Sequence, residues 1–130
     1  MVDLTPMLVV RDVPASSKWY QGLLELTSAH GGDEFEMLID DEGKMQLFLH
    51  HREFGEHPGM SDPGEGVPGR GVLLYVSVPD VEACFRRAVE MRASTVDEPH
   101  ANPIAQAVEF TVKDPDGYAV TVSERRASAS

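Results

Sequence analysis

Three histidines near the middle of the chain are the side chains whose types and spacing most suggest a chemical site. His50 and His51 end an apolar segment, and His57 follows in a stretch rich in Gly and Pro. Three imidazoles can bind zinc or nickel. Neighbouring residues of a strand point to opposite faces, however, so His50 and His51 do not easily join one ion. The alternative is that all three are solvated or lie at a strand edge, as we expect for His30 and His100.

Two further side chains with reactive groups are Cys84 and Glu109. Cys84 is the single cysteine, which excludes an intramolecular disulfide and a metal site built from several cysteines. It lies on the apolar face of a predicted helix, where cysteine behaves as a small hydrophobic residue. Glu109 lies in a predicted strand. If it faces a cavity, it is suited to act as a base or to bind a cationic ligand; if it faces solvent, it is an ordinary strand glutamate.

The composition limits the classes of partner. The chain has 130 residues, 11 basic and 22 acidic side chains, and a formal charge of −11. This length predicts one domain, and the acidic balance argues against nucleic acid and anionic membranes, which require a basic surface. No apolar segment approaches the ~20 residues of a membrane span, and no basic region precedes the first apolar segment. A single cysteine fits a reducing compartment, so we expect a cytoplasmic protein.

The elements that must position these side chains follow from hydrophobic periodicity and turn residues. Alternation of apolar residues predicts strands, and helical spacing after Asp12 and Asp80 predicts two helices. Gly and Pro are concentrated in residues 52–69, which we expect to form a linker. The predicted helices cover residues 14–24 and 81–92, and the predicted strands cover residues 4–10, 25–30, 34–40, 45–51, 71–78, 94–98, 106–112 and 118–123.

The two halves of the chain repeat one pattern. The letters DVPA of residues 12–15 recur as DVEA in residues 80–83, and DDEG of residues 40–43 recurs as DPDG in residues 114–117. Each half therefore predicts a strand, a helix and three strands, and a unit that cannot close its own core must pack on its twin. We expect a single domain with repeat 1 at about residues 4–51, the linker at 52–69, and repeat 2 at about residues 70–124.

Several motifs in this repeat are similar to those of a known family. They are LVVRDV at residues 8–13 with WY at 19–20, VSVPDV at 76–81, and FTVKDPDGY at 110–118. With them the chain resembles the vicinal-oxygen-chelate superfamily, which includes glyoxalase I, extradiol dioxygenases and bleomycin-resistance proteins. The resemblance implies an α+β fold in which two tandem βαβββ units form a cupped mixed sheet around a cavity, with the helices outside. It also implies a homodimer.

Metal-using members of this superfamily hold a divalent ion with four strand residues. The resemblance assigns these positions to Thr5, Leu47, Leu73 and Thr121. A divalent ion requires His, Glu, Asp or Gln at such positions. Two leucines and two threonine hydroxyls do not supply that set, and a shift by one residue adds only Gln46. We therefore expect neither a metal nor another cofactor.

The same positions imply which face of each strand lines the cavity, and alternation extends that face along the strand. The predicted lining is apolar and rich in Met in the first half and more polar in the second. Such walls suit flat, irregular ligands that a few polar groups orient. The alternative is that these side chains simply fill a core. The predicted ligand-binding residues are Met7, Phe35, Met37, Leu47, Leu49, His51, Tyr75, Glu109 and Thr121.

Three functions are consistent with these observations. The resemblance and the unsuited metal positions favour metal-independent binding or sequestration of an amphipathic or aromatic small molecule, an antibiotic being one such compound. The alternative is a metal-dependent enzyme of the same superfamily, a glyoxalase-like lyase or isomerase or a dioxygenase, with its ion in a displaced site. The third is a structural or regulatory domain without a ligand, which would lack an open cavity.

Overall fold

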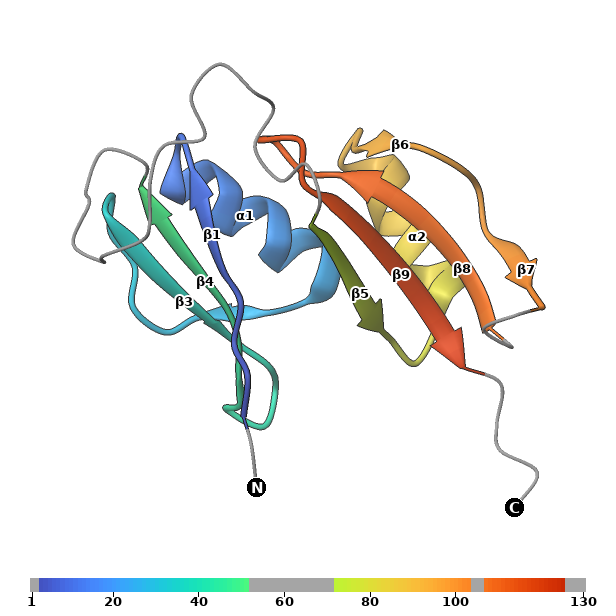
Figure 1. Ribbon diagram of the computed structural model, residues 1–130, viewed down its shortest axis with the longest axis horizontal. Coiled ribbons are helices and arrows are strands. Elements are labelled where there is room, and N and C mark those ends of the chain that lie inside the picture. Colours follow the sequence, from blue (N-terminus) through green and yellow to red (C-terminus); the bar gives the residue numbers. More distant parts are fainter. Residues whose placement is uncertain (1–2, 52–71, 104–106, 126–130) are drawn as a thin grey trace.

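The computed structural model of the protein describes residues 3–51, 72–103 and 107–125. The predicted linker, residues 52–69, lies outside these ranges. Within them the chain forms two sheets, of four and five strands, and a helix packs on each (Figure 1). The predicted α+β class with two βαβββ units is confirmed.

The first half of the chain forms the four-stranded sheet. Its strand order is β1-β4-β3-β2, with β1 parallel to β4 and the other pairs antiparallel. The crossover that a parallel pair requires contains α1. The elements are β1 (Met7–Val10), α1 (Val13–Leu24), β2 (Thr27–Ser28), β3 (Phe35–Ile39) and β4 (Met45–His51).

The second half repeats this order with one additional strand. The order is β5-β9-β8-β6, β5 is parallel to β9, and β7 also pairs with β8. The sequence did not predict β7, and the predicted strand over residues 94–98 is reduced to two residues. The elements are β5 (Leu73–Ser77), α2 (Val81–Glu90), β6 (Ser94–Thr95), β7 (His100–Asn102), β8 (Ala107–Lys113) and β9 (Ala119–Arg125).

The repeated aspartate before each helix is its N-cap. The Asp12 carboxylate accepts a hydrogen bond from the N–H of Ala15 at 3.0 Å, and Asp80 accepts one from Ala83 at 3.1 Å. Each bond satisfies an N–H that has no partner within the first turn of the helix. The sequence repeat at residues 12–15 and 80–83 therefore marks two equivalent helix starts.

Each helix packs on one face of its own sheet, and that face carries the aliphatic side chains. Leu8, Val10 and Leu38 are buried in the first half, and Val120 and Val122 are buried in the second. The two helices also contact each other. In the view of Figure 1, α1 extends into the space between the two sheets. Because the helices lie together, the opposite face of each sheet points away from the shared core.

A buried polar network joins the turn between β8 and β9 to the first half. The Tyr20 hydroxyl donates to Oδ2 of Asp114 at 2.7 Å, and Arg11 donates through N and Nε to Oδ1 of Asp116 at 3.0 and 2.9 Å. Burial raises the pKa of both the Asp114 carboxyl and the Tyr20 hydroxyl, so the hydroxyl stays the donor. Tyr20 is fully buried, so its side chain both packs in the core and contributes this bond between the halves.

Candidate ligand-binding site

The face of the first sheet that α1 does not cover carries sulfur and aromatic side chains. In the register, Met7 pairs with Phe48, Phe48 with Met37, and His50 with Phe35. Paired residues of neighbouring strands point to the same side of a sheet. We call this side the open face of the first sheet; its side chains are Met7, Val9, Phe35, Met37, Phe48 and His50.

A hollow with a volume of about 720 Å³ lies on this open face. Four rings surround it: the centroid of Phe35 lies 5.3 Å from that of His30, 5.5 Å from that of Phe48 and 6.2 Å from that of His50. The rings meet edge-on or tilted, which is the arrangement that aromatic pairs prefer. The lining residues are Met7, His30, Gly31, Gly32, Asp33, Glu34, Phe35, Phe48 and His50.

Glu36 holds the loop that forms the rim of the hollow. Its side chain points to the α1 side and is 3% exposed. The carboxylate accepts hydrogen bonds from the N–H of Gly31 at 2.8 Å and from the hydroxyls of Ser17 and Ser28 at 2.9 Å. Burial favours the neutral acid, but these donors outweigh it and hold the pKa of Glu36 below its ordinary value of 4.5. A fixed carboxylate thus positions a loop that carries part of the site.

The predicted face of β4 is wrong by one residue, because β4 contains a β-bulge. Ile39 pairs with Met45 and Leu38 pairs with Leu47, so Gln46 is an extra residue in the antiparallel ladder. The corresponding pair β8 and β9 has a regular register from end to end. One extra residue inverts the alternation of every side chain that follows it in the strand.

Three predicted ligand-binding residues consequently lie on the side of the sheet that faces α1. Leu47 and Leu49 are 4% and 0% exposed and belong to the core, and His51 shares their side. Phe48 and His50, which the sequence reasoning missed, occupy the open face instead. The sequence did carry a sign of this arrangement, because the aliphatic Leu47 and Leu49 alternate with the rings of Phe48 and His50. A strand with this pattern is expected to turn its aliphatic side chains toward the core.

The other six predicted residues lie on the expected faces. Met7, Phe35 and Met37 belong to the open face of the first sheet, and Met7 and Phe35 also line the hollow. The remaining three belong to the second sheet, on the side away from α2, which we call its open face. They are Tyr75, Glu109 and Thr121.

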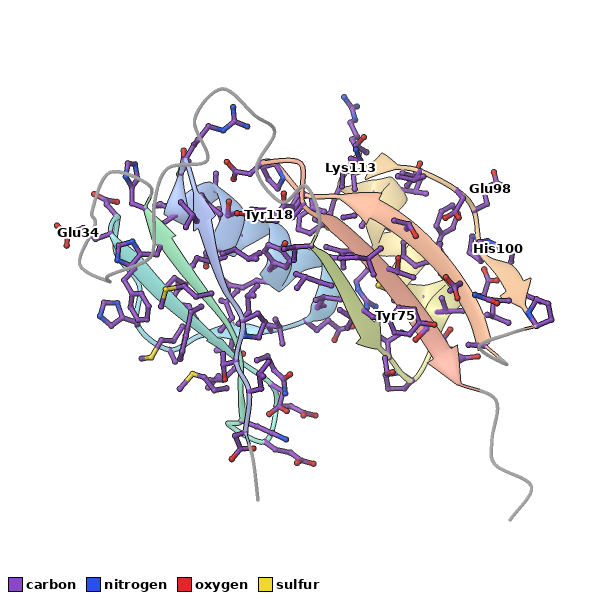
Figure 2. The ribbon with its side chains drawn as sticks, in the orientation of Figure 1. Glu34, Tyr75, Glu98, His100, Lys113 and Tyr118 are labelled. Atoms are coloured by element: carbon purple, nitrogen blue, oxygen red, sulfur yellow. The ribbon has the colours of Figure 1, made fainter. Side chains whose placement is uncertain are left out.

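Hydrogen bonds connect the polar side chains on the open face of the second sheet. The Tyr75 hydroxyl and the Asn102 amide both donate to Oε1 of Glu109, at 3.2 and 2.8 Å. The Thr111 and Thr121 hydroxyls lie 2.8 Å apart and share a hydrogen bond. Figure 2 shows Tyr75 beside β5 on the viewer's side of the molecule. Thr121 is 3% exposed, so the accessible polar groups on this face are those of Tyr75, Glu109 and Thr111, whereas the open face of the first sheet carries rings and sulfur.

A second hollow of about 630 Å³ lies between the two halves. Leu47 and Tyr75 both line it, together with Leu24, Leu26 and Leu74. Its walls are mainly aliphatic, with Asp40 and Asp41 at the turn between β3 and β4. The structure thus brings two of the predicted residues together here rather than on one open face.

The positions expected to hold a metal do not fit one. With the bulge taken into account, they become Thr5, Phe48, Leu73 and Thr121. Two hydroxyls, a ring and an alkyl chain supply no strong ligand for a divalent ion. Within the described ranges, no group of three His, Cys, Asp or Glu side chains could hold one either.

The histidine cluster is divided between two faces of the first sheet. His50 lies on the open face and His51 on the other, as strand alternation predicts. His57 lies outside the described residues. His30 is exposed after the end of β2, as expected, and its ring also lies beside that of Phe35 at the hollow.

Comparison with known proteins settles the family. A family model described as the Glyoxalase/Bleomycin resistance protein/Dioxygenase superfamily matches residues 4–122. The chain belongs to this superfamily. The match spans both halves and confirms the resemblance that the motifs indicated. No curated protein matches the chain in sequence.

Solved structures share the same glyoxalase-type fold. A protein of unknown function from Agrobacterium tumefaciens str. C58 is 24% identical, with 97% of this chain and 95% of that chain covered and a TM-score of 0.76. A glyoxalase/bleomycin resistance protein/dioxygenase family enzyme from Burkholderia phytofirmans PsJN is 16% identical, with 94% and 97% covered and a TM-score of 0.77. TioX from Micromonospora sp. ML1 is 17% identical, with 97% and 100% covered and a TM-score of 0.72.

Membership of the glyoxalase superfamily establishes the fold and leaves the chemistry to the site, because one fold hosts many functions. The side chains around the aromatic hollow therefore decide what this member does. In the described ranges, none of the helices has the length and apolar character needed to cross a membrane.

Proposed function

We propose that this protein binds a flat aromatic small molecule, without a metal, on the open face of the first sheet. The observation that carries the proposal is the cluster of four rings around a hollow of about 720 Å³. A volume of this size holds a drug-sized ligand. Met7 adds a polarisable side chain that adapts to irregular shapes. Sequestration of such a compound, as in bleomycin resistance, is the function that this site supports best.

The residues at the metal positions, rather than the superfamily, favour binding over a metal-dependent reaction in this member. Its description includes bleomycin-resistance proteins as well as glyoxalases and dioxygenases. In this chain the four positions expected to hold a metal carry Thr5, Phe48, Leu73 and Thr121, which are unsuited to a divalent ion. Nothing in the described site favours the enzyme alternative over binding.

A homodimer is part of the proposal, because two sheet edges and several apolar side chains are uncovered among the described residues. β1 and β5 each end their sheet, so both leave one edge without a neighbouring strand in the described fold. Leu73 and Tyr75 on β5 are 54% and 48% exposed. A two-fold axis would place the first sheet of each copy against the second sheet of the other copy, which gives two equivalent contacts. Unpaired edges and exposed apolar side chains both favour such a contact.

Titration with acridine, a neutral tricyclic aromatic compound, tests the proposal. We expect saturable binding with one site per chain, measured by acridine fluorescence and by calorimetry. Substitution Phe48→Ala removes a ring from the hollow and is expected to weaken binding about 5- to 150-fold, the effect of losing ~1–3 kcal/mol of stacking. Sedimentation equilibrium is expected to give twice the chain mass of 14.3 kDa.

Val96→Ala is the matched control, because Val96 is 59% exposed and does not line the hollow. It should leave acridine affinity unchanged. Absence of saturable binding by any compound in a broad aromatic panel would overturn the proposed function. If Phe48→Ala and Val96→Ala weakened acridine binding equally, the hollow would be excluded as the binding site.

A further inference from the structure

Hydrogen bonds and a ring contact hold His30 in place at the rim of the aromatic hollow. Its backbone N–H donates to Oε1 of Glu36 at 3.3 Å, and the N–H of Gly31 donates to the same oxygen at 2.8 Å. The imidazole meets the ring of Phe35 edge-on, with 5.3 Å between the centroids. The side chain is exposed, so it is held in position and is still accessible to a ligand in the hollow.

A hydrogen bond from the imidazole of His30 decides which of its nitrogens carries the proton. Nδ1 lies 2.6 Å from the carbonyl oxygen of Gly31. A carbonyl oxygen only accepts hydrogen bonds, so Nδ1 is the N–H donor. In the neutral imidazole the other nitrogen, Nε2, then has no proton and is an acceptor. Among the residues that the structure describes, none bonds to Nε2 of His30.

Other polar groups at the rim of the hollow are acceptors as well. Asp33 and Glu34 line the hollow, and their ionised carboxylates accept hydrogen bonds but donate none. The backbone N–H groups of His30 and Gly31 are already bonded to Glu36. In a site with mainly apolar walls, a few polar groups fix the orientation of the ligand. An aromatic ligand with an N–H or O–H at its edge therefore complements this rim.

We propose that Nε2 of His30 selects aromatic ligands that carry an N–H or O–H donor at the edge of their ring system. The rings around the hollow contact the flat part of such a ligand, and His30 accepts its hydrogen bond. A ligand with an acceptor at the same position leaves Nε2 without a donor and binds more weakly. His30 is thus a specificity residue of the aromatic hollow, and this inference rests on the proposed function.

Three uncharged tricyclic compounds of one shape isolate this hydrogen bond. Carbazole has an N–H at the position where fluorene has a CH2 group and dibenzofuran has an oxygen. The affinity of each is measured by displacement of acridine at about pH 8, at which a free imidazole is neutral. We expect carbazole to bind most tightly and dibenzofuran least tightly. The ratio of carbazole to dibenzofuran affinity is compared between parent and variant, because differences in hydration between the compounds then cancel.

Substitution His30→Phe keeps a ring beside Phe35 and removes the acceptor. It should lower the ratio of carbazole to dibenzofuran affinity about 2- to 13-fold, the effect of one hydrogen bond between neutral groups. His100→Phe is the matched control and should leave the ratio unchanged. His100 is also exposed, and its Nδ1 also lies near a carbonyl oxygen, that of Glu98 at 2.9 Å, but it does not line the hollow.

Nitrogen NMR of the histidine rings tests the proton position directly, without a ligand. The signals of His30 are identified by their absence from the spectrum of His30→Phe. We expect Nδ1 to carry the proton in the neutral ring, and a proton on Nε2 instead would overturn the inference. An equal fall of the affinity ratio in His30→Phe and His100→Phe would also overturn it.

The outcomes also separate this inference from the proposed function. Saturable acridine binding with an affinity ratio that His30→Phe leaves unchanged would keep the aromatic site and exclude the role of His30. Absence of saturable binding by acridine and by all three tricyclic compounds would overturn both. Circular dichroism of each variant verifies that its fold is intact before affinities are compared.

Discussion

Substitution Tyr20→Phe tests whether the polar network between the two halves stabilises the fold. The variant keeps the buried ring and removes only the hydroxyl that donates to Oδ2 of Asp114 at 2.7 Å. Oδ1 of Asp114 keeps its bonds from the N–H groups of Asp116 and Tyr118, each at 2.9 Å. The loss is therefore one hydrogen bond to a buried carboxylate.

The size of the effect follows from the charge and burial of Asp114. A hydrogen bond to a charged group contributes about 1.5–3 kcal/mol, compared with about 0.5–1.5 kcal/mol for a neutral pair. Asp114 is 5% exposed, so solvent replaces the lost donor poorly. We expect Tyr20→Phe to lower the free energy of unfolding by about 2 kcal/mol, and Tm by roughly 6–10 °C for a chain of this length.

Tyr118→Phe is the matched control at the same junction, where Figure 2 labels Tyr118 between the two sheets. Its hydroxyl donates to the neutral carbonyl of Val9 at 2.9 Å, so the expected loss is about 1 kcal/mol. Urea unfolding followed by circular dichroism at one fixed protein concentration measures both variants, because association shifts apparent stability. A double-mutant cycle with Asp114→Asn isolates the pair.

A loss for Tyr20→Phe no greater than that for Tyr118→Phe would refute the reasoning. It would mean that Asp114 is solvated or neutral in the folded protein. A coupling energy near zero between Tyr20 and Asp114 would have the same meaning, because the cycle removes effects that each variant has alone.

Two further predictions concern Glu36 and metals. Because the pKa of Glu36 is held below 4.5 in the folded protein, its stabilising contribution is present above that pH and is lost as the pH falls through the folded value. In urea unfolding, Glu36→Gln should therefore be less stable than the parent at neutral pH. The difference in stability between the two proteins should shrink as the pH is lowered, and a difference that does not change with pH would contradict this prediction. Elemental analysis after incubation with zinc, nickel, manganese or iron(II) and desalting should give far less than one metal per chain, and one retained equivalent would restore the enzyme alternative.

Local structure was predictable because its causes are local. Asp12 and Asp80 begin helices because a short carboxylate satisfies a free N–H three residues later. The acidic turns were recognisable because each ends in a glycine, Gly43 or Gly117. A turn of this kind needs a positive φ, which glycine adopts readily, and the two angles are 81° and 92°. These signals, repeated in the same order, were sufficient for the two βαβββ units and the family.

The faces along one strand follow from alternation as long as no extra residue interrupts that strand. β8 and β9 pair without interruption, and Glu109 and Thr121 lie on the predicted face. In β4 the bulge at Gln46 inverts the pattern, so Phe48 and His50 replace Leu47 and Leu49 on the open face. A bulge depends on how two strands pair, and the sequence of either strand alone carries little sign of it.

The sequence by itself determined both helices, most of the strands and the repetition of the two units. Tertiary structure alone decided which rings meet at the hollow, that Glu36 holds its rim, and that Tyr20 bonds to Asp114. The physical reason is the separation of the interacting groups along the chain, because caps and turns depend on groups only a few residues apart. A hollow, a buried carboxylate and the network between the halves depend on side chains that only the packed fold brings together.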